Sequence, residues 1–171
     1  MNADLDQIKA ILQSTPKRWQ SLLEGLPEEL VRRRPAEAEW SAVECLLHLL
    51  DGEQKVFPVR VEAFLAGRDL VPFDPDREGT QPTAEMKPAA LAAEFAARRA
   101  SSLRGLERVT AGDLDRQVRH PQFGEVKLRE HLNEWAAHDL DHTIQAERAL
   151  MQPFIDQAGP WQGSFEGNRI K

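Results

Sequence analysis

Residues 128–145, L-R-E-H-L-N-E-W-A-A-H-D-L-D-H-T-I-Q, carry a long helical signal. Their apolar side chains spread around much of the helical circumference, which predicts a helix largely enclosed by other elements. A stripe with spacings of three and four residues shares one face of this helix: His131, Glu134, Trp135, His138, His142 and Gln145. We expect the helix to run from about Lys127 to Met151.

The stripe contains a pair of histidines, His138 and His142, that are four residues apart. At this spacing their side chains point the same way, so their ring nitrogens can bind one metal ion. Such a spacing also arises by chance in helices, and the pair alone is therefore weak evidence for a metal site.

A third histidine, His48, lies far upstream in the apolar run E-C-L-L-H-L-L at 44–50. If it is buried it needs a polar partner, and a metal ion is one such partner. Measured around a regular helix, however, it lies roughly opposite an apolar stripe, which is equally compatible with a partly exposed residue: Leu46, Leu50 and Phe57.

A metal site formed by His48, His138 and His142 would leave coordination positions open for water or substrate. That pattern is typical of catalytic sites rather than closed structural ones. Cys45, one turn before His48, is a candidate fourth ligand, but its apolar surroundings favour a small core residue.

Two further residues of the stripe are candidates for catalysis. His131 could contact the ligands or the substrate, or be a hydrogen-bonded core histidine. Glu134 is the nearest carboxylate and a candidate general base, with a surface salt bridge as the alternative. Asp139 and Asp141 point off the stripe, so we expect helix-capping or surface roles for them.

Arg98 and Arg99 interrupt the apolar face of a second expected helix, at 88–109. One of the two must lie near the core. Its stem can pack while its charged head reaches solvent, which is the usual behaviour of long cationic side chains. Alternatively the guanidinium enters the site and holds a carboxylate substrate, and on this ground Arg98 is a candidate catalytic residue.

Two more helices are expected. The sequence W-S-A-V-E at 40–44 predicts a helix start at which Ser41 and Glu44 form a capping box. This helix should run to about residue 66 with a kink at Pro58, and an N-terminal helix over 4–24 should be kinked or split at Pro16.

The connections complete an all-α, four-helix bundle with one long crossover, at 68–86. The 111–126 segment can form a small hairpin, and β content should otherwise be near zero. Trp161 and Phe165 are expected to pack the tail, 153–171, back on the bundle. We expect a single domain over 1–171 with its core at about 5–150.

Composition excludes several classes of protein. The net charge of −6 argues against nucleic-acid binding, because phosphate contacts need a basic face. No stretch is long and apolar enough to span a membrane, and the start lacks the features of a signal peptide. The single cysteine fits a reducing cytoplasm. We expect a cytoplasmic protein that acts on a small molecule, with a homodimer as an open alternative.

The segments W-S-A-V-E-C-L-L-H-L-L-D-G-E, R-H-P-Q-F-G and L-R-E-H-L-N-E-W-A-A-H-D-L-D-H-T-I-Q together resemble the DinB-like superfamily. That group includes YfiT-like metal-dependent hydrolases, thiol-dependent S-transferases and maleylpyruvate isomerases. The resemblance covers about 5–150 and implies a four-helix bundle. It implies a metal triad at His48, His138 and His142, with zinc or nickel as the ion.

Three functions follow as alternatives. The first is a metal-dependent S-transferase that joins a low-molecular-weight thiol, such as bacillithiol or mycothiol, to a small electrophile. The second is a metal-dependent hydrolase, for which His131 or Glu134 is the candidate base. The third is a non-catalytic, stress-related helical bundle whose metal is structural.

Overall fold

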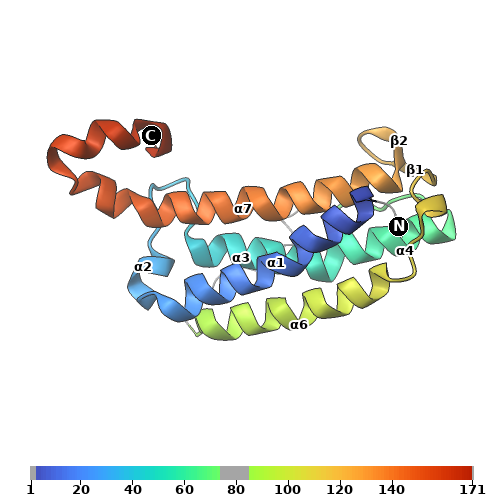
Figure 1. Cartoon of the computed structure of the whole chain (residues 1–171), viewed down its shortest axis with the longest axis horizontal. Helices are drawn as coiled ribbons and strands as arrows, with labels where there is room; N and C mark the ends of the chain where they lie inside the picture. Colours follow the sequence, from blue (N-terminus) through green and yellow to red (C-terminus); the bar gives the residue numbers. More distant parts are fainter. Residues whose placement is uncertain (1–2, 74–84, 171) are drawn as a thin grey trace.

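The computed structural model describes residues 3–73 and 85–170, and within them the chain is an elongated bundle of helices (Figure 1). Its long elements are α1 (Ala3–Gly25), α3 (Ala42–Asp51) with its continuation, α6 (Pro88–Leu106) and α7 (Leu128–Asp156). α1 packs against α6 and α7, and α3 packs against the same two helices. The predicted all-α, four-helix bundle is confirmed. Residues 74–84 of the expected crossover lie outside the described residues.

The start of α3 is fixed by the predicted capping box. The Ser41 hydroxyl accepts a hydrogen bond from the Glu44 backbone N–H at 3.3 Å, and the Glu44 carboxylate accepts one from the Ser41 N–H at 2.9 Å. Two N–H groups that would otherwise be unpaired at the helix start are thereby satisfied. Trp40 comes immediately before this cap, so the cap also fixes where the indole enters the bundle.

The helical pattern changes after α3, in a π-helical turn η1 (Gly52–Val56) that leads into α4 (Phe57–Ala66). Pro58 lies in the first turn of α4, where a missing N–H is tolerated. The expected irregularity is therefore present, but it precedes Pro58. A π-turn holds one residue more than an α-turn, so it rotates every following side chain around the helix. α4 ends at Ala66 and is capped by Gly67, whose φ of 62° is favourable for glycine.

Pro16 does not split α1, which is one helix from Ala3 to Gly25. A proline at this position leaves the carbonyl four residues earlier without its helical donor, and that carbonyl belongs to Leu12. The Leu12 oxygen instead accepts a hydrogen bond from Arg99 Nη1 of α6 at 3.0 Å. A side chain of the neighbouring helix α6 thus replaces the backbone donor that Pro16 lacks.

The buried apolar side chains form two clusters. One contains the aromatic side chains of Phe57, Phe64 and Trp135, and the other contains Trp19, Leu46 and Phe95. Cys45 belongs to the second cluster and is fully buried, as expected for a small core residue.

The predicted hairpin is present between α6 and α7. Strands β1 (Gln117–His120) and β2 (Gly124–Lys127) pair antiparallel, with Val118 opposite Val126. A short helix α2 (Glu28–Arg32) and the 3₁₀ turn η2 (Ala111–Asp113) were not predicted. No helix of 3–73 or 85–170 combines the length and apolar character needed to cross a membrane.

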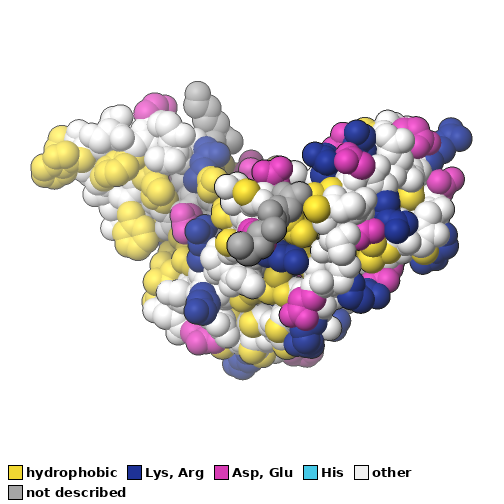
Figure 2. Space-filling view, turned by 45° about the vertical axis from the view of Figure 1, so that its right-hand side comes forward, with side chains coloured by type: hydrophobic (Ala, Val, Ile, Leu, Met, Phe, Trp, Pro, Cys, Tyr) yellow, Lys and Arg dark blue, Asp and Glu magenta, His cyan; other side chains and the backbone are white. Residues whose placement is uncertain are grey.

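The C-terminal tail differs from the expectation. α7 continues through Pro153 to Asp156, beyond the predicted end at Met151, and is followed by the 3₁₀ segment η3 (Gly159–Asn168). Trp161 and Phe165 are 69% and 40% exposed, so the prediction that they pack on the bundle is wrong. In Figure 2, hydrophobic side chains gather on the surface at the left end of the molecule. Over the rest of this face, acidic and basic side chains intermingle.

Polar contacts hold the tail to α7 instead. The Gln152 amide donates to the Asn168 carbonyl and accepts from the Ile170 N–H, both at 3.0 Å. Through these contacts, residues 169–170 fold back against α7 and lie next to the face that carries His142 and Gln145.

Candidate metal centre

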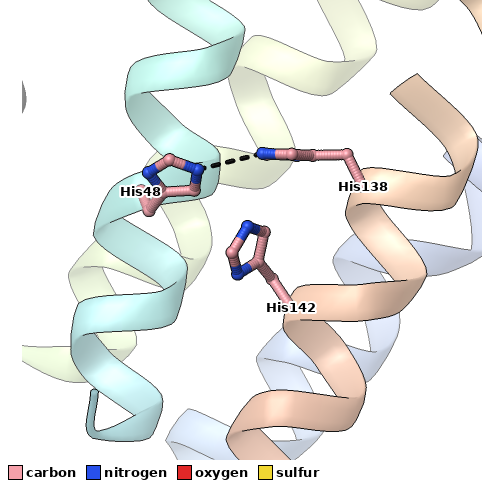
Figure 3. A group of neighbouring side chains, drawn as sticks. All are labelled: His48, His138 and His142. Carbon is pink, nitrogen blue, oxygen red and sulfur yellow. Dashed lines mark hydrogen bonds between the residues drawn. The ribbon is translucent and has the colours of Figure 1, made fainter. Parts of the chain in front are cut away.

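Three histidines from two helices converge between α3 and α7. His48 projects from α3, and His138 and His142 project from successive turns of α7 toward it (Figure 3). The Nε2 atoms of His48 and His138 are 2.9 Å apart, and one ring nitrogen from each of the three lies within 4.8 Å of the others. All three side chains are half-buried. The structure thus brings together the residues that sequence reasoning grouped.

The spacing of these nitrogens fits one metal ion. Two imidazole nitrogens on a tetrahedral zinc at about 2.0–2.1 Å lie roughly 3.4 Å apart. The observed separations, from 2.9 Å to less than 4.8 Å, span that value, so modest side-chain movement would seat an ion. Two neutral ring nitrogens facing each other across 2.9 Å also share a single proton at most, whereas an ion satisfies both.

The environment favours the neutral form of His138 and His142. Burial, reinforced by the neighbouring His142 and His48, lowers the pKa of His138 to about 3. Burial also lowers the pKa of His142, although the hydrogen bond that His142 donates to the Gln145 amide oxygen acts in the opposite direction. Metal ligation requires the neutral imidazole, so these two rings are in the form that binds a metal.

Neighbouring side chains fix the orientation of the rings. The Gln145 amide oxygen accepts a hydrogen bond from His142 Nδ1 at 2.8 Å, which leaves Nε2 free to bind a metal. Phe57 packs edge-on against the His138 ring, with centroids 5.0 Å apart. His138 Nδ1 is buried and has no hydrogen-bond partner among the described residues, so no neighbouring group fixes the orientation of this ring through Nδ1.

Trp40 is a part of the site that sequence reasoning missed. Its ring stacks on His142 at 5.7 Å with an interplanar angle of 25°, and it lies 5.0 Å from the His48 ring. The signal was available: a tryptophan immediately before the cap of the helix that carries His48 is fixed in place relative to that histidine.

His131 and Glu134 lie along α7 next to the triad. His131 is buried, and its Nδ1 is 3.1 Å from the Glu134 carboxylate while its Nε2 is 3.2 Å from the Phe57 carbonyl. The hydrogen bond from His131 lowers the pKa of Glu134, so this carboxylate is ionised at neutral pH. Glu134 and His138 line the same shallow depression, of about 570 Å³. A carboxylate thus lies near His138, one of the candidate metal ligands.

The two consecutive arginines of α6 have different roles. Arg98 pairs with Glu94 at 2.8 Å on the exposed face of the helix and lines neither the cavity beside His142 nor the depression that contains His138. Arg99 is the one buried at the core, 1% exposed, where it binds Glu53 and Asp139. Its head does not reach solvent, so the usual behaviour of long cationic side chains does not apply here.

Asp139 departs from its expected capping or surface role. Both of its oxygens accept hydrogen bonds from Arg99, at 2.6 and 3.0 Å, and it is 1% exposed. The charge of Arg99 is what permits this burial, because a buried carboxylate requires a paired cation. Cys45 is not part of the ligand cluster; burial raises the pKa of its thiol to about 12.

A cavity of about 820 Å³ opens beside His142, on the side away from His138 along α7. Trp40 and Gln145 line it, together with Arg148 and the returning tail residues Arg169 and Ile170. The metal site is therefore bordered by enough space for a small molecule.

Comparison with known proteins agrees with this architecture. The sequence profile of the DinB superfamily matches residues 11–146. The fold is similar to that of YfiT from Bacillus subtilis, described as a probable metal-dependent hydrolase with an unusual four-helix bundle topology, at a TM-score of 0.74 and 16% identity over 90% of each chain. It is also similar to the DinB-like protein YjoA from Bacillus subtilis, at a TM-score of 0.58 and 21% identity over 86% of this chain and 92% of that one. No match was found among curated protein sequences.

Proposed function

Since this chain belongs to the DinB superfamily, we propose that it is an enzyme that binds a divalent metal ion through His48, His138 and His142 and acts on a small molecule. The observation that carries the proposal is the convergence of three half-buried imidazoles beside a cavity. Zinc or nickel suits three such nitrogen ligands. A divalent ion held there lowers the pKa of a thiol or water bound at its open position.

The reaction we propose is transfer of a low-molecular-weight thiol to a small electrophile. An S–C bond forms while the S–H bond of the thiol and the bond from carbon to the leaving group break, and the proton passes to Glu134 and then to the leaving group. Two features support this choice. The sequence motifs resemble the DinB-like superfamily, which includes thiol-dependent S-transferases, and the 820 Å³ cavity beside His142 lies in the size range of small-molecule sites.

The chain's own residues have distinct tasks in this scheme. The three imidazoles hold the ion, and Gln145 orients His142. Glu134, ionised and hydrogen-bonded to His131, is placed to accept the proton released by the nucleophile. Trp40 covers one side of the ligand rings and limits the access of water to them.

A metal-dependent hydrolase is the second candidate, and Glu134 is the observation that favours it. Hydrolysis needs a base near the ion, and this carboxylate lies in the same depression as His138. YfiT, which has a similar fold, is described as a probable metal-dependent hydrolase. The same ligands serve both reactions, so activity must distinguish them.

The deciding assay uses protein reconstituted with zinc or nickel. Consumption of bacillithiol, mycothiol or another small thiol with monochlorobimane, lost in His138→Ala, supports the transferase. Hydrolysis of activated esters without thiol, lost in His138→Ala and strongly reduced in Glu134→Gln, supports the hydrolase. If neither activity appears with metal firmly bound, the ion is structural and the enzymatic proposal is wrong.

A further inference from the structure

Arg148 on α7 has an unsatisfied cationic side chain. Its Nε is buried yet has no hydrogen-bond partner among the described residues, and it forms no ion pair with a carboxylate in 3–73 or 85–170. The other arginine of the same cavity, Arg169, is paired with Asp156 at 3.2 Å and Gln162 at 3.3 Å. Arg148 lines the cavity without a carboxylate partner among the described residues, so an anionic group that enters the cavity is the partner expected for its charge.

The position of Arg148 connects it to the metal site. It follows His142 by six residues on one helix, roughly 9 Å along the axis, and shares a cavity with His142 and Gln145. Side chains on a helix lean toward its N-terminus, so along the axis the Arg148 side chain leans in the direction of His142. A molecule of a few atoms in length can thus reach from the triad to Arg148.

The remaining walls restrict the ligand further. Trp40, Ile144 and Ile170 give the cavity apolar surfaces. Glu39 and Asp141 also line it, so the two arginines are balanced by two carboxylates. That balance disfavours a polyanion such as a phosphate ester. It suits a group with a single negative charge on a short apolar chain.

We propose that this cavity is the subsite for a carboxylate carried by the small-molecule substrate, with Arg148 as the carboxylate's partner and Trp40 as the surface for its hydrocarbon part. The inference rests on the proposed metal-dependent function and specifies its substrate class. The carboxylate binds the guanidinium while the other end of the molecule lies at His48, His138 and His142.

The test compares two thiols of equal length, 3-mercaptopropionate and 3-mercapto-1-propanol, on protein loaded with cobalt(II), whose visible spectrum reports binding at the ion. We expect the carboxylated thiol to bind wild type about 10- to 100-fold more tightly, the range of one charge-assisted hydrogen bond. Arg148→Met should abolish this preference. Arg98→Met, at an arginine paired with Glu94 on the exposed face of α6, is the matched control and should retain it.

Each outcome separates the two proposals. Equal affinity for both thiols in wild type, or an unchanged preference in Arg148→Met, overturns the carboxylate subsite and leaves the metal-dependent thiol chemistry intact. If neither thiol changes the spectrum, the proposed thiol chemistry is wrong, and calorimetric titration with propionate then tests the carboxylate subsite separately. Propionate binding to wild type that is lost in Arg148→Met supports the carboxylate subsite. No propionate binding to wild type, or equal binding to both proteins, overturns the carboxylate subsite.

Discussion

Arg99 of α6 and Asp139 of α7 form a two-point ion pair in the core of the bundle, with Nη1–Oδ2 and Nη2–Oδ1 distances of 2.6 and 3.0 Å. Glu53 of η1 accepts a third hydrogen bond, from Arg99 Nε at 2.7 Å, and also one from Trp135 Nε1 at 3.2 Å. Asp139 follows His138, a proposed metal ligand, directly in sequence. The network thus joins three helical elements and is one residue away from the candidate metal centre along α7.

Removing one side of this pair should be costly. We expect Asp139→Ala to lower the free energy of unfolding by about 3–5 kcal/mol, because it leaves a buried charge without one of its partners. Urea denaturation of the metal-free protein measures this. Glu94→Ala, which breaks the exposed pair with Arg98, should cost no more than about 1 kcal/mol. Similar losses in the two variants would show that the buried network is not a main source of stability.

Gly52, at the start of the π-turn, offers a packing test. A Cβ at this position would lie 3.1 Å from the Phe57 ring and 4.0 Å from His138 Cε1. Phe57 cannot easily move, because it stacks on Trp135 with centroids 5.2 Å apart. We expect Gly52→Ala to destabilise the fold by about 1–3 kcal/mol, the usual cost of overpacking.

Gly105 of α6 is the matched control for that substitution. No atom lies within 4 Å of its added Cβ, so Gly105→Ala should stabilise the protein by about 0.5–1 kcal/mol through helix propensity. Thermal melts of both variants check the pair. Stabilisation by both alanines would mean that Phe57 and His138 are not tightly packed around Gly52.

Much of the fold and of the ligand set was predictable because the signals were local. A capping box at Ser41 and histidines four residues apart on α7 depend on short spacings. The position of Phe57 was not predictable, because the π-turn at Gly52–Val56 rotates it relative to a regular helix and brings it against His138. The choice between Arg98 and Arg99 depended on Glu53 and Asp139, which only tertiary structure brings together.

The same limit explains the missed tail. Helix propensity predicts that α7 ends before Pro153, but the following residues continue the helix and return to Gln152 through hydrogen bonds. Propensity is a weak prior that tertiary contacts can override.

Gln145 should tune metal affinity without binding the metal. It accepts the hydrogen bond from His142 Nδ1, and loss of such a contact typically weakens metal binding about 10- to 100-fold. We predict this for Gln145→Met, with about one ion per chain still bound at saturation, measured by competition with a chelator. Gln13→Met, at an exposed position of α1, is the control. Unchanged metal affinity in Gln145→Met would show that Gln145 does not contribute to metal binding.

The metal-free protein should lose stability as the pH falls below about 6.5. The pKa of His138 is about 3 in the folded state, lowered by burial and by His142 and His48, so the unfolded chain binds more protons between these values. Stability is therefore full above pH 6.5 and declines on acidification by up to about 1.4 kcal/mol per pH unit for each such group. Urea midpoints of chelator-treated protein from pH 7.5 to 5 should follow this slope.

His138→Gln should flatten that dependence, since one of the groups that resists protonation in the fold is gone. His142, whose pKa is also lowered, retains its share. A wild-type stability that is constant or rises on acidification would contradict the neutral, buried state of these imidazoles.

The most direct test of the metal site is the metal content of untagged protein by mass spectrometry, for wild type beside the His48→Ala/His142→Ala double variant. We predict about one zinc or nickel ion per chain in wild type and none in the variant, with the helical circular dichroism spectrum of both preserved. Wild type that holds no ion even after reconstitution with zinc and nickel, or a variant that binds as much as wild type, would contradict the triad and the function proposed from it.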